Sequence, residues 1–198
     1  MPGQANTAIG FRAHAGWAAA VCIAGPTGFP AVVRRHRLLL TDTSLPCEPY
    51  HAAKRMDFTA AEGIIRDASE RAQQMATRWI RTVIVELGDH HLVGIGVVLG
   101  TGRPDFTLRQ ALATHAATHN AEGWLFREAL MRAGEGCGLR VVGALETAAY
   151  WEAAAAAGLP AASIEERVPE LGREVGAPWG KDQKLAAAVA WLALGQRS

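Results

Sequence analysis

The sequence predicts an α/β fold in which a mixed β-sheet is covered by helices on both faces. Three observations support this expectation. The chain begins with three short strand-like segments joined by tight turns, as an antiparallel meander does. Two long amphipathic helical segments follow, and each leads into a short apolar run that is typical of a strand buried on both faces. Antiparallel strands followed by alternating helices and interior strands indicate a layered α/β domain.

The opening strands are expected at residues 8–14, 16–24 and 31–40. The turn "GPTGFP" separates the second strand from the third, because glycine and proline favour tight turns over strands. The segment "LPCEPYHAAKRMD" has two prolines and no regular period, so we expect a loop that leads into a helix.

A long amphipathic helix is expected from Thr59 to Leu87, where apolar residues recur at steps of three and four. The apolar run at 92–100 is predicted as an interior strand. A second long helix is expected from Thr107, its N-cap, to Glu135. The remaining elements are an interior strand at 139–145, helices at 146–159 and 163–176 with a break at Pro169, and a last helix at 181–195.

Composition limits the classes of function. The chain has 198 residues, which favours one domain over residues 1–198, and 49% hydrophobic against 20% charged residues, as in a globular protein. The formal charge of +1 provides no global field, so nucleic-acid binding would need a local basic patch. The three widely spaced cysteines are expected to be reduced packing residues of a cytoplasmic, bacterial protein. We expect neither a signal peptide nor a membrane span.

The order of elements, together with two short stretches, resembles a known superfamily. "GFRAHAGWAAAV" is similar to the opening strand pair of the ribonuclease H-like superfamily, and "DQKLAAAVAWLAL" is similar to its closing helix. Within that superfamily the arrangement resembles the RuvC-type Holliday-junction resolvases. The resemblance implies a nuclease site in which carboxylates on the first strand, the central strand and the last helix hold two magnesium ions.

Most of those carboxylates are missing from this sequence. Arg12 stands where the resemblance implies the first aspartate, and the central strand ends "VVLGTG" without an acid. On the last helix Asp182 matches the pattern, but Leu185 stands where a second acid is expected. One carboxylate cannot hold two metal ions, so the sequence predicts that two-metal nuclease chemistry is absent.

Basic residues suggest a different site in the same place. If the fold is as predicted, Arg12, Arg103 and Lys184 converge at one edge of the sheet, and His14 shares the face of Arg12. Such an edge commonly binds ligands, and fixed cations there suit a phosphate or a carboxylate.

An equally open interpretation is structural. Arg12 and Lys184 could simply pair with Asp182 or Glu122 as buried ion pairs, with no ligand at all.

Polar residues also interrupt the apolar stripe of the second long helix, which is expected to pack on the sheet. His115, His119 and Glu122 lie on that stripe at four- and three-residue steps, so they could ligate zinc or another transition metal. His119 and Glu122 could equally act as a general base and its orienting acid. The alternatives are a buried hydrogen-bond network or a stripe that faces solvent.

The basic run "RRHR" at 34–37 lies on the third strand, where side chains alternate between faces. It is more typical of a solvated edge strand than of a nucleic-acid platform. The sequence has no phosphate-binding G-x-x-x-x-G-K-[ST] loop and no G-x-S-x-G nucleophile motif.

The leading hypothesis is a protein of ribonuclease H-like fold that binds an anionic ligand, either nucleic acid or a nucleotide, with no cofactor and no two-metal nuclease activity. The alternative is a hydrolase or nuclease whose site is His115, His119 and Glu122 on the second long helix. In this alternative His14 or Asp182 would assist, with or without a bound divalent metal. A third hypothesis makes the polar stripe an interface with a partner. The apolar last helix would also permit a homodimer.

Overall fold

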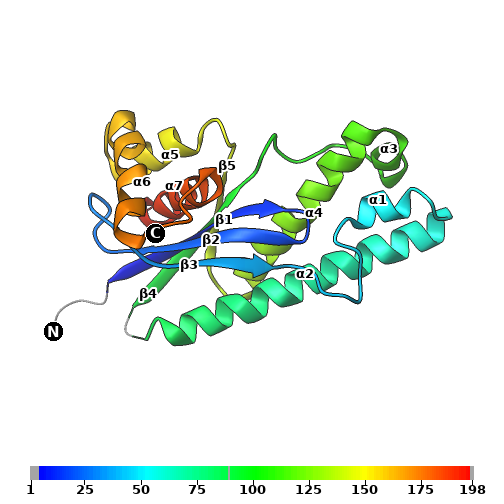
Figure 1. The fold of residues 1–198 in the computed structure, drawn as a ribbon, viewed down its shortest axis with the longest axis horizontal. Helices are drawn as coiled ribbons and strands as arrows, with labels where there is room; N and C mark the ends of the chain where they lie inside the picture. Colours follow the sequence, from blue (N-terminus) through cyan, green and yellow to red (C-terminus); the bar gives the residue numbers. More distant parts are fainter. Residues whose placement is uncertain (1–4, 89, 197–198) are drawn as a thin grey trace.

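The computed structural model describes residues 5–88 and 90–196, and its centre is one mixed five-stranded sheet (Figure 1). The strands β1 (Asn6–His14), β2 (Trp17–Ala24) and β3 (Ala31–Leu39) form an antiparallel meander. β4 (His91–Val98) pairs in parallel with β1, and β5 (Arg140–Ala144) in parallel with β4. The strand order β3-β2-β1-β4-β5 confirms the predicted fold class.

One face of the sheet is covered by α2 (Phe58–Glu86) and α4 (His115–Gly136), with the short helices α1 (Pro49–Ala53) and α3 (Leu108–Ala113) beside them (Figure 1). The inner side of α2 is mostly alanine, which lets the helix lie close to its neighbours. Ile80 and Val83 of this helix join Phe11 of β1 and Phe126 of α4 in one buried cluster. The periodic pattern that predicted α2 therefore marks its buried face.

The opposite face is covered by α5 (Ala149–Ala157), α6 (Ala161–Val175) and α7 (Lys181–Gly195). α7 lies directly on β1 and β4, where glycines leave room for it. A Cβ atom on Gly10 would come within 1.8 Å of the Ala186 carbonyl oxygen, and one on Gly96 within 2.0 Å of the Val189 carbonyl oxygen. These two glycines therefore allow the backbone of the helix to contact the sheet.

The apolar part of the last helix, which by its sequence would permit a homodimer, has no free surface in the described chain. Every residue from Leu185 to Gly195 is buried within a single chain, between the sheet and the helices α5 and α6. The apolar sequence "AVAWLALG" is thus the core of one protomer, because this helix covers the centre of the sheet.

Three predictions about helices are wrong. The segment "LPCEPYHAAKRMD", expected as a loop, contains the short helix α1. The second long helix is two helices, since Thr114 adopts an extended conformation (φ −130°, ψ 157°) and accepts a hydrogen bond from the Ala117 amide as the N-cap of α4. The predicted N-cap Thr107 is confirmed at the start of α3. Pro169 does not break α6, because buried residues on both sides of it, among them Val168 and Leu171, hold the helix in place.

The cysteines are free. Cys22 is buried and Cys137 packs half-buried against the core, as predicted, whereas Cys47 is exposed. Burial raises the pKa of the Cys22 thiol to about 12. No helix within the described ranges combines the length and the apolar character needed to cross a bilayer.

Candidate anion-binding cleft

A cleft of about 470 Å³ lies at the carboxyl ends of the parallel strands. β1 contributes Arg12 and His14 to it, and the segments after β4 and β5 contribute Thr101 and Glu146. α4 forms the opposite wall, and Glu48, directly before α1, completes the lining. The carboxyl ends of β1, β4 and β5 meet at this edge because the three strands are parallel, and this is where open α/β sheets bind ligands.

Arg12 is the centre of an ion-pair network. Its Nη2 atom lies 2.9 Å from the Glu146 carboxylate, and its Nε atom lies 3.8 Å from Asp182 Oδ1. The Lys181 ammonium lies 2.5 Å from the other oxygen of Glu146. The hydrogen bond from Lys181, together with the charge of Arg12, lowers the pKa of Glu146. His14 Nε2 lies 3.0 Å from Asp182 Oδ1, within ion-pair distance but without making a hydrogen bond.

This network does not fit the two-metal centre that the resemblance implied. The Arg12 guanidinium stands at the first-strand position and pairs with both nearby carboxylates, so a divalent cation would meet a fixed positive charge there. Throughout the described part of the chain, no group of three or more His, Cys, Asp or Glu side chains is arranged to hold a metal ion. No step through a metal ion is therefore derived for this cleft.

Arg127 of α4 is a cleft residue that the sequence did not reveal. Its guanidinium lies against two glycines: a Cβ on Gly100 would come within 2.6 Å of Nη2, and one on Gly123 within 3.1 Å of the same group. Burial lowers the pKa of Arg127, and the nearby charge of Arg12 lowers it further. Within the described residues Arg127 makes no direct ion pair, although the charge of Glu146 acts on it and opposes this lowering of its pKa.

In the sequence, only Gly123 indicates that space is kept for the Arg127 side chain, because this glycine lies one helical turn earlier on the same face of α4. The second glycine, Gly100, follows β4, far away in sequence, and only the fold brings it to the guanidinium.

Glu122 is almost fully buried, at 2% exposure. It bonds to the segment before α2 rather than to the sheet. Its Oε2 atom accepts hydrogen bonds from the backbone amides of Tyr50 (3.0 Å) and His51 (3.2 Å), and lies 3.1 Å from His51 Nδ1. Burial raises the pKa of Glu122, although the hydrogen bonds from His51 oppose the shift. Glu122 thus fastens α1 to α4, while its Oε1 atom has no hydrogen-bond partner.

The histidines of the predicted stripe lie elsewhere than expected. His115 and His119 are exposed. The break at Thr114 ends α3, and the first turns of α4, which carry both histidines, lie beyond the sheet. The His115 ring lies 5.6 Å from the His51 ring and 6.4 Å from the His119 ring, and His119 reaches the rim of the cleft. The three stripe residues therefore do not converge on one ligand position, and His51 is the histidine that contacts Glu122.

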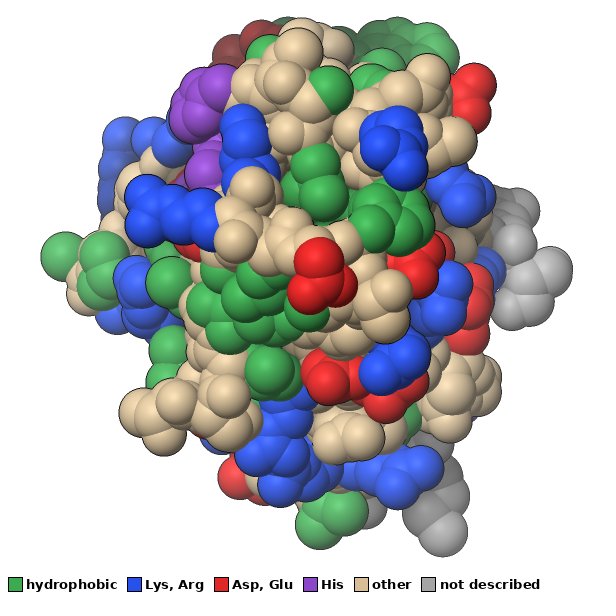
Figure 2. Space-filling model, turned by 90° about the vertical axis from the view of Figure 1, so that its right-hand side faces the viewer, with side chains coloured by type: hydrophobic (Ala, Val, Ile, Leu, Met, Phe, Trp, Pro, Cys, Tyr) green, Lys and Arg blue, Asp and Glu red, His purple; other side chains and the backbone are tan. Residues whose placement is uncertain are grey.

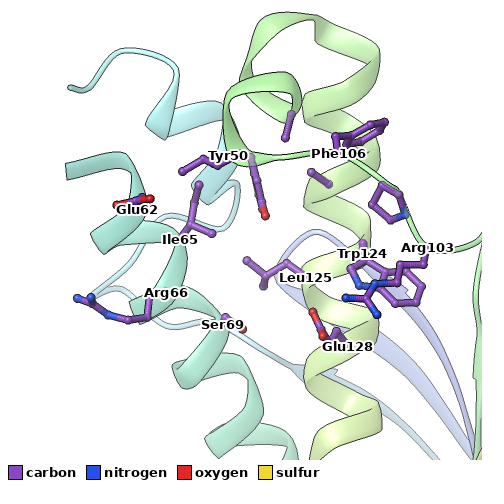
Figure 3. A pocket seen from close by; sticks show the side chains of 14 residues that line it. Tyr50, Glu62, Ile65, Arg66, Ser69, Arg103, Phe106, Trp124, Leu125 and Glu128 are labelled. Atoms are coloured by element: carbon purple, nitrogen blue, oxygen red, sulfur yellow. The ribbon is translucent and has the colours of Figure 1, made fainter. Parts of the chain in front are cut away.

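Arg103 and Lys184 do not line the cleft. Arg103 lies on a second cavity of about 550 Å³ between α2 and α4, beside Trp124 (Figure 3). In the same view Ile65 of α2 and Leu125 of α4 lie on opposite sides of that cavity. Lys184 is half-buried near the start of α7. Lys181, the first residue of the helix, is the lysine that pairs with Glu146.

The basic run on β3 contacts other parts of the chain, and β3 is an edge strand as predicted. Arg35 donates hydrogen bonds to three carbonyl groups in the loop before α7, and the Arg37 guanidinium lies 3.6 Å from the centre of the Trp17 ring. Arg34 pairs with Glu86. Figure 2 shows the face of the molecule that lies on the right-hand side of Figure 1. On that face Lys and Arg side chains are scattered among acidic and hydrophobic ones and form no single basic patch.

The cleft also gathers most of the unsatisfied buried polar atoms. In the described residues five buried side-chain nitrogen or oxygen atoms lack a hydrogen-bond partner, and four belong to residues that line the cleft. These four are Arg12 Nε, His14 Nε2, Glu122 Oε1 and Arg127 Nε. All four are shielded from solvent, and Arg12 Nε and His14 Nε2 lie within ion-pair distance of Asp182 Oδ1, so charge rather than well-aligned hydrogen bonding holds this part of the cleft wall together.

Comparisons with known proteins support the fold. No family model matches the chain, and no curated protein matches it. Among solved structures, the chain is similar to Thermus thermophilus RuvC in complex with a Holliday junction substrate, with a TM-score of 0.54, 11% identity, and coverage of 94% of this chain and 90% of that one. It is also similar to a second Thermus thermophilus RuvC structure, with a TM-score of 0.51, 10% identity, and coverage of 94% and 92%. The chain therefore has the ribonuclease H-like α/β fold, in the arrangement found in RuvC.

Proposed function

We propose that this protein binds nucleic acid at the cleft and does not cleave it by two-metal chemistry. The single observation that carries the proposal is the pairing of Arg12 with Glu146 and Asp182 at the position of the first carboxylate. The adjacent Arg127 guanidinium makes no direct ion pair within the described residues and lines the same cleft.

The chemistry of the cleft suits a phosphate group. An arginine guanidinium donates several hydrogen bonds in a plane that matches a phosphate, and it remains charged when partly buried. The solved structure of similar fold with a Holliday junction substrate makes nucleic acid the first ligand to test. With a net charge of +1 and scattered surface cations, the affinity is expected to depend on a few local contacts rather than on a general basic surface.

The test measures binding of labelled single-stranded, duplex and four-way-junction DNA by fluorescence anisotropy. We expect at least one of these probes to bind at low salt, and the affinity to fall as salt rises, because phosphate contacts release counterions. Arg127→Ala should weaken binding by about ten-fold or more, since a hydrogen bond to a charged group is lost.

Arg81→Ala is the matched control. It removes the same charge from an exposed position on α2, away from the cleft, and should change the affinity by less than about two-fold. The absence of binding to all three probes, or equal binding by wild type and Arg127→Ala, would refute the proposal. Metal-dependent cleavage of any probe by the wild type would refute its second half.

One observation favours a second function, a hydrolase with a His/Glu site. Glu122 holds His51 through Nδ1, as an orienting carboxylate holds a general base. The pair differs from the predicted His119–Glu122 pair. Hydrolysis of an activated phosphodiester or ester that is lost in His51→Ala but retained in His115→Ala would support this function, and the absence of turnover by the wild type would exclude it for these substrates.

A further inference from the structure

The cavity between α2 and α4 takes no part in the proposed function. It measures about 550 Å³, and it shares no lining residue with the cleft (Figure 3). Aromatic and aliphatic residues predominate in its lining, among them Tyr50, Phe106, Trp124, Ile65 and Leu125. A concave site of this volume, with apolar walls and a few polar groups, is typical of a small-molecule site.

The aromatic side chains of this cavity leave contact area uncovered. Phe106 is 39% exposed, and Tyr50 and Trp124 are half-buried. Aromatic rings attract one another in offset-stacked and edge-to-face arrangements, beyond the gain from burying their area. The body of a ligand that covers these side chains is therefore expected to be a planar aromatic group.

Two polar groups of the cavity wall are hydrogen-bond donors that make no hydrogen bond within the described residues. Figure 3 shows one of them, the Tyr50 hydroxyl, pointing into the cavity. Burial raises the pKa of Tyr50, and nearby carboxylates raise it further, so the hydroxyl keeps its proton. The other donor is the indole N–H of Trp124, whereas Trp179 and Trp191 donate theirs to backbone carbonyls. These donors favour a ligand that carries acceptors.

A cation lies on the α4 side of the cavity. Arg103 belongs to the segment between β4 and α3, and Figure 3 shows its side chain extending toward Trp124. In the described part of the chain Arg103 makes no ion pair, and the acid on the same side, Glu128, pairs with Arg132 at 2.9 Å. A guanidinium in this position suits a carboxylate, which it can bind through two parallel hydrogen bonds.

The α2 side of the cavity has the opposite character. Glu62 lies there, on the other side of the cavity from Arg103 in Figure 3. Arg66, on the same helix, pairs with Asp67 and extends away from the cavity. A carboxylate at Arg103 therefore stays away from the charge of Glu62, and a ligand with one charged end is expected to bind in one direction.

We propose that this cavity binds a small aromatic carboxylate. The carboxylate accepts hydrogen bonds from Arg103 and from the indole N–H of Trp124. The aromatic body lies between Ile65 of α2 and Leu125 of α4. This site and its ligand are independent of nucleic-acid binding at the cleft.

The experiment measures the binding of three probes with one ring system to the intact chain by equilibrium dialysis. The probes are naphthoate, its neutral analogue naphthamide, and naphthylmethylammonium, which carries the opposite charge. We expect naphthoate to bind about ten-fold more tightly than naphthamide, because a hydrogen bond to a charged group is stronger than one to a neutral group. The ammonium probe should bind more weakly than naphthamide, since its charge repels Arg103.

Arg103→Ala tests the position of the carboxylate. It should weaken the binding of naphthoate by about ten-fold and that of naphthamide by much less, because only the carboxylate uses the positive charge. Arg66→Ala is the matched control: it removes the same charge from a side chain that points away from the cavity, and should change the affinity for naphthoate by less than about two-fold. Both arginines are exposed, so neither substitution removes a core contact.

Equal affinity for naphthoate and naphthamide, or tightest binding of the ammonium probe, would overturn the proposal. Naphthoate binding that Arg103→Ala does not weaken would also overturn it, because the carboxylate would then bind elsewhere on the chain. The same holds if naphthoate does not bind at about 10 mM, since a ligand of this size that fits a preformed cavity should bind at about 1 mM or below. None of these outcomes affects the proposed function of the cleft.

Discussion

At the scale of single residues, one substitution relative to the implied site changes the chemistry available to the fold. Arg12 places a positive charge where the resemblance to resolvases implies a negative one, and Glu146 and Asp182 both pair with it. The two carboxylates come from different elements, the segment after β5 and the start of α7, so the guanidinium links parts of the chain that are distant in sequence. An ion pair of this kind also makes the carboxylates less available to an external cation.

Arg12→Asp should therefore create an affinity for Mn²⁺ that the wild type lacks at this cleft. The substitution removes the guanidinium and places three carboxylates, at positions 12, 146 and 182, around one space, which suits a hard divalent cation even though Lys181 still pairs with Glu146. Isothermal titration calorimetry with Mn²⁺ measures the gain, and Arg12→Ala, with two carboxylates, should bind more weakly. A folded Arg12→Asp protein that binds no more Mn²⁺ than the wild type would show that these carboxylates do not converge closely enough.

At the scale of elements, the connections between helices and strands depend on a few polar residues outside the apolar pattern. Glu122 joins α4 to α1 through two backbone amides, and Thr114 separates α3 from α4. Asp42, in the loop after β3, accepts a 2.7 Å hydrogen bond from Arg71 Nε on α2 and another from the Ser44 amide. The hydrogen bonds from Ser44 and Arg71 lower the pKa of Asp42 from 3.8 to about 2.

This shift predicts a pH dependence of stability. Because the pKa of Asp42 is lower in the folded state than in the unfolded state, its contribution is present above the unfolded value near 3.8 and is lost as pH falls through about 2. Asp42→Asn should lower the urea midpoint at pH 7, and the difference from wild type should shrink between about pH 5 and pH 2. A difference that stays constant over this range would mean that the charge of Asp42 does not stabilise the loop.

At the scale of the whole molecule, stability depends on the close contact between α7 and the sheet. All apolar residues of α7 after its first turn are buried, and Gly10 and Gly96 provide the space beneath it. This contact also places Lys181 and Asp182, on the first turn of α7, beside the cleft residues Glu146 and Arg12. The packing of the core and the geometry of the site are therefore coupled.

Gly10→Ala should destabilise the protein by about 3 kcal/mol or more, because the new methyl group would collide with backbone atoms of α7 that cannot move independently. Gly63→Ala is the control: it lies on α2 with no atom within 4 Å of the added carbon, and should stabilise by about 0.5–1 kcal/mol through helix propensity. Urea unfolding measures both. A Gly10→Ala variant as stable as the wild type would show that α7 can shift away from β1.

The sequence by itself determined the order and type of the elements, because the spacing of apolar residues is local. The repeats of three and four marked α2, the short apolar runs marked β4 and β5, and the capping residue Thr107 marked the start of α3. The same local pattern did not predict the break between α3 and α4 at Thr114. The apolar spacing continues through this residue, and only the backbone conformation shows the change.

Only the tertiary structure decided which polar residues meet. Arg12, His14 and Asp182 were chosen from the sequence and do lie together, because strand alternation and the start of the last helix place them at one edge. Arg127 could not be found in this way, since its space depends on a glycine from another element. Side-chain convergence is set by long-range packing, which leaves no periodic trace in the sequence, and so the cleft became visible only in the folded chain.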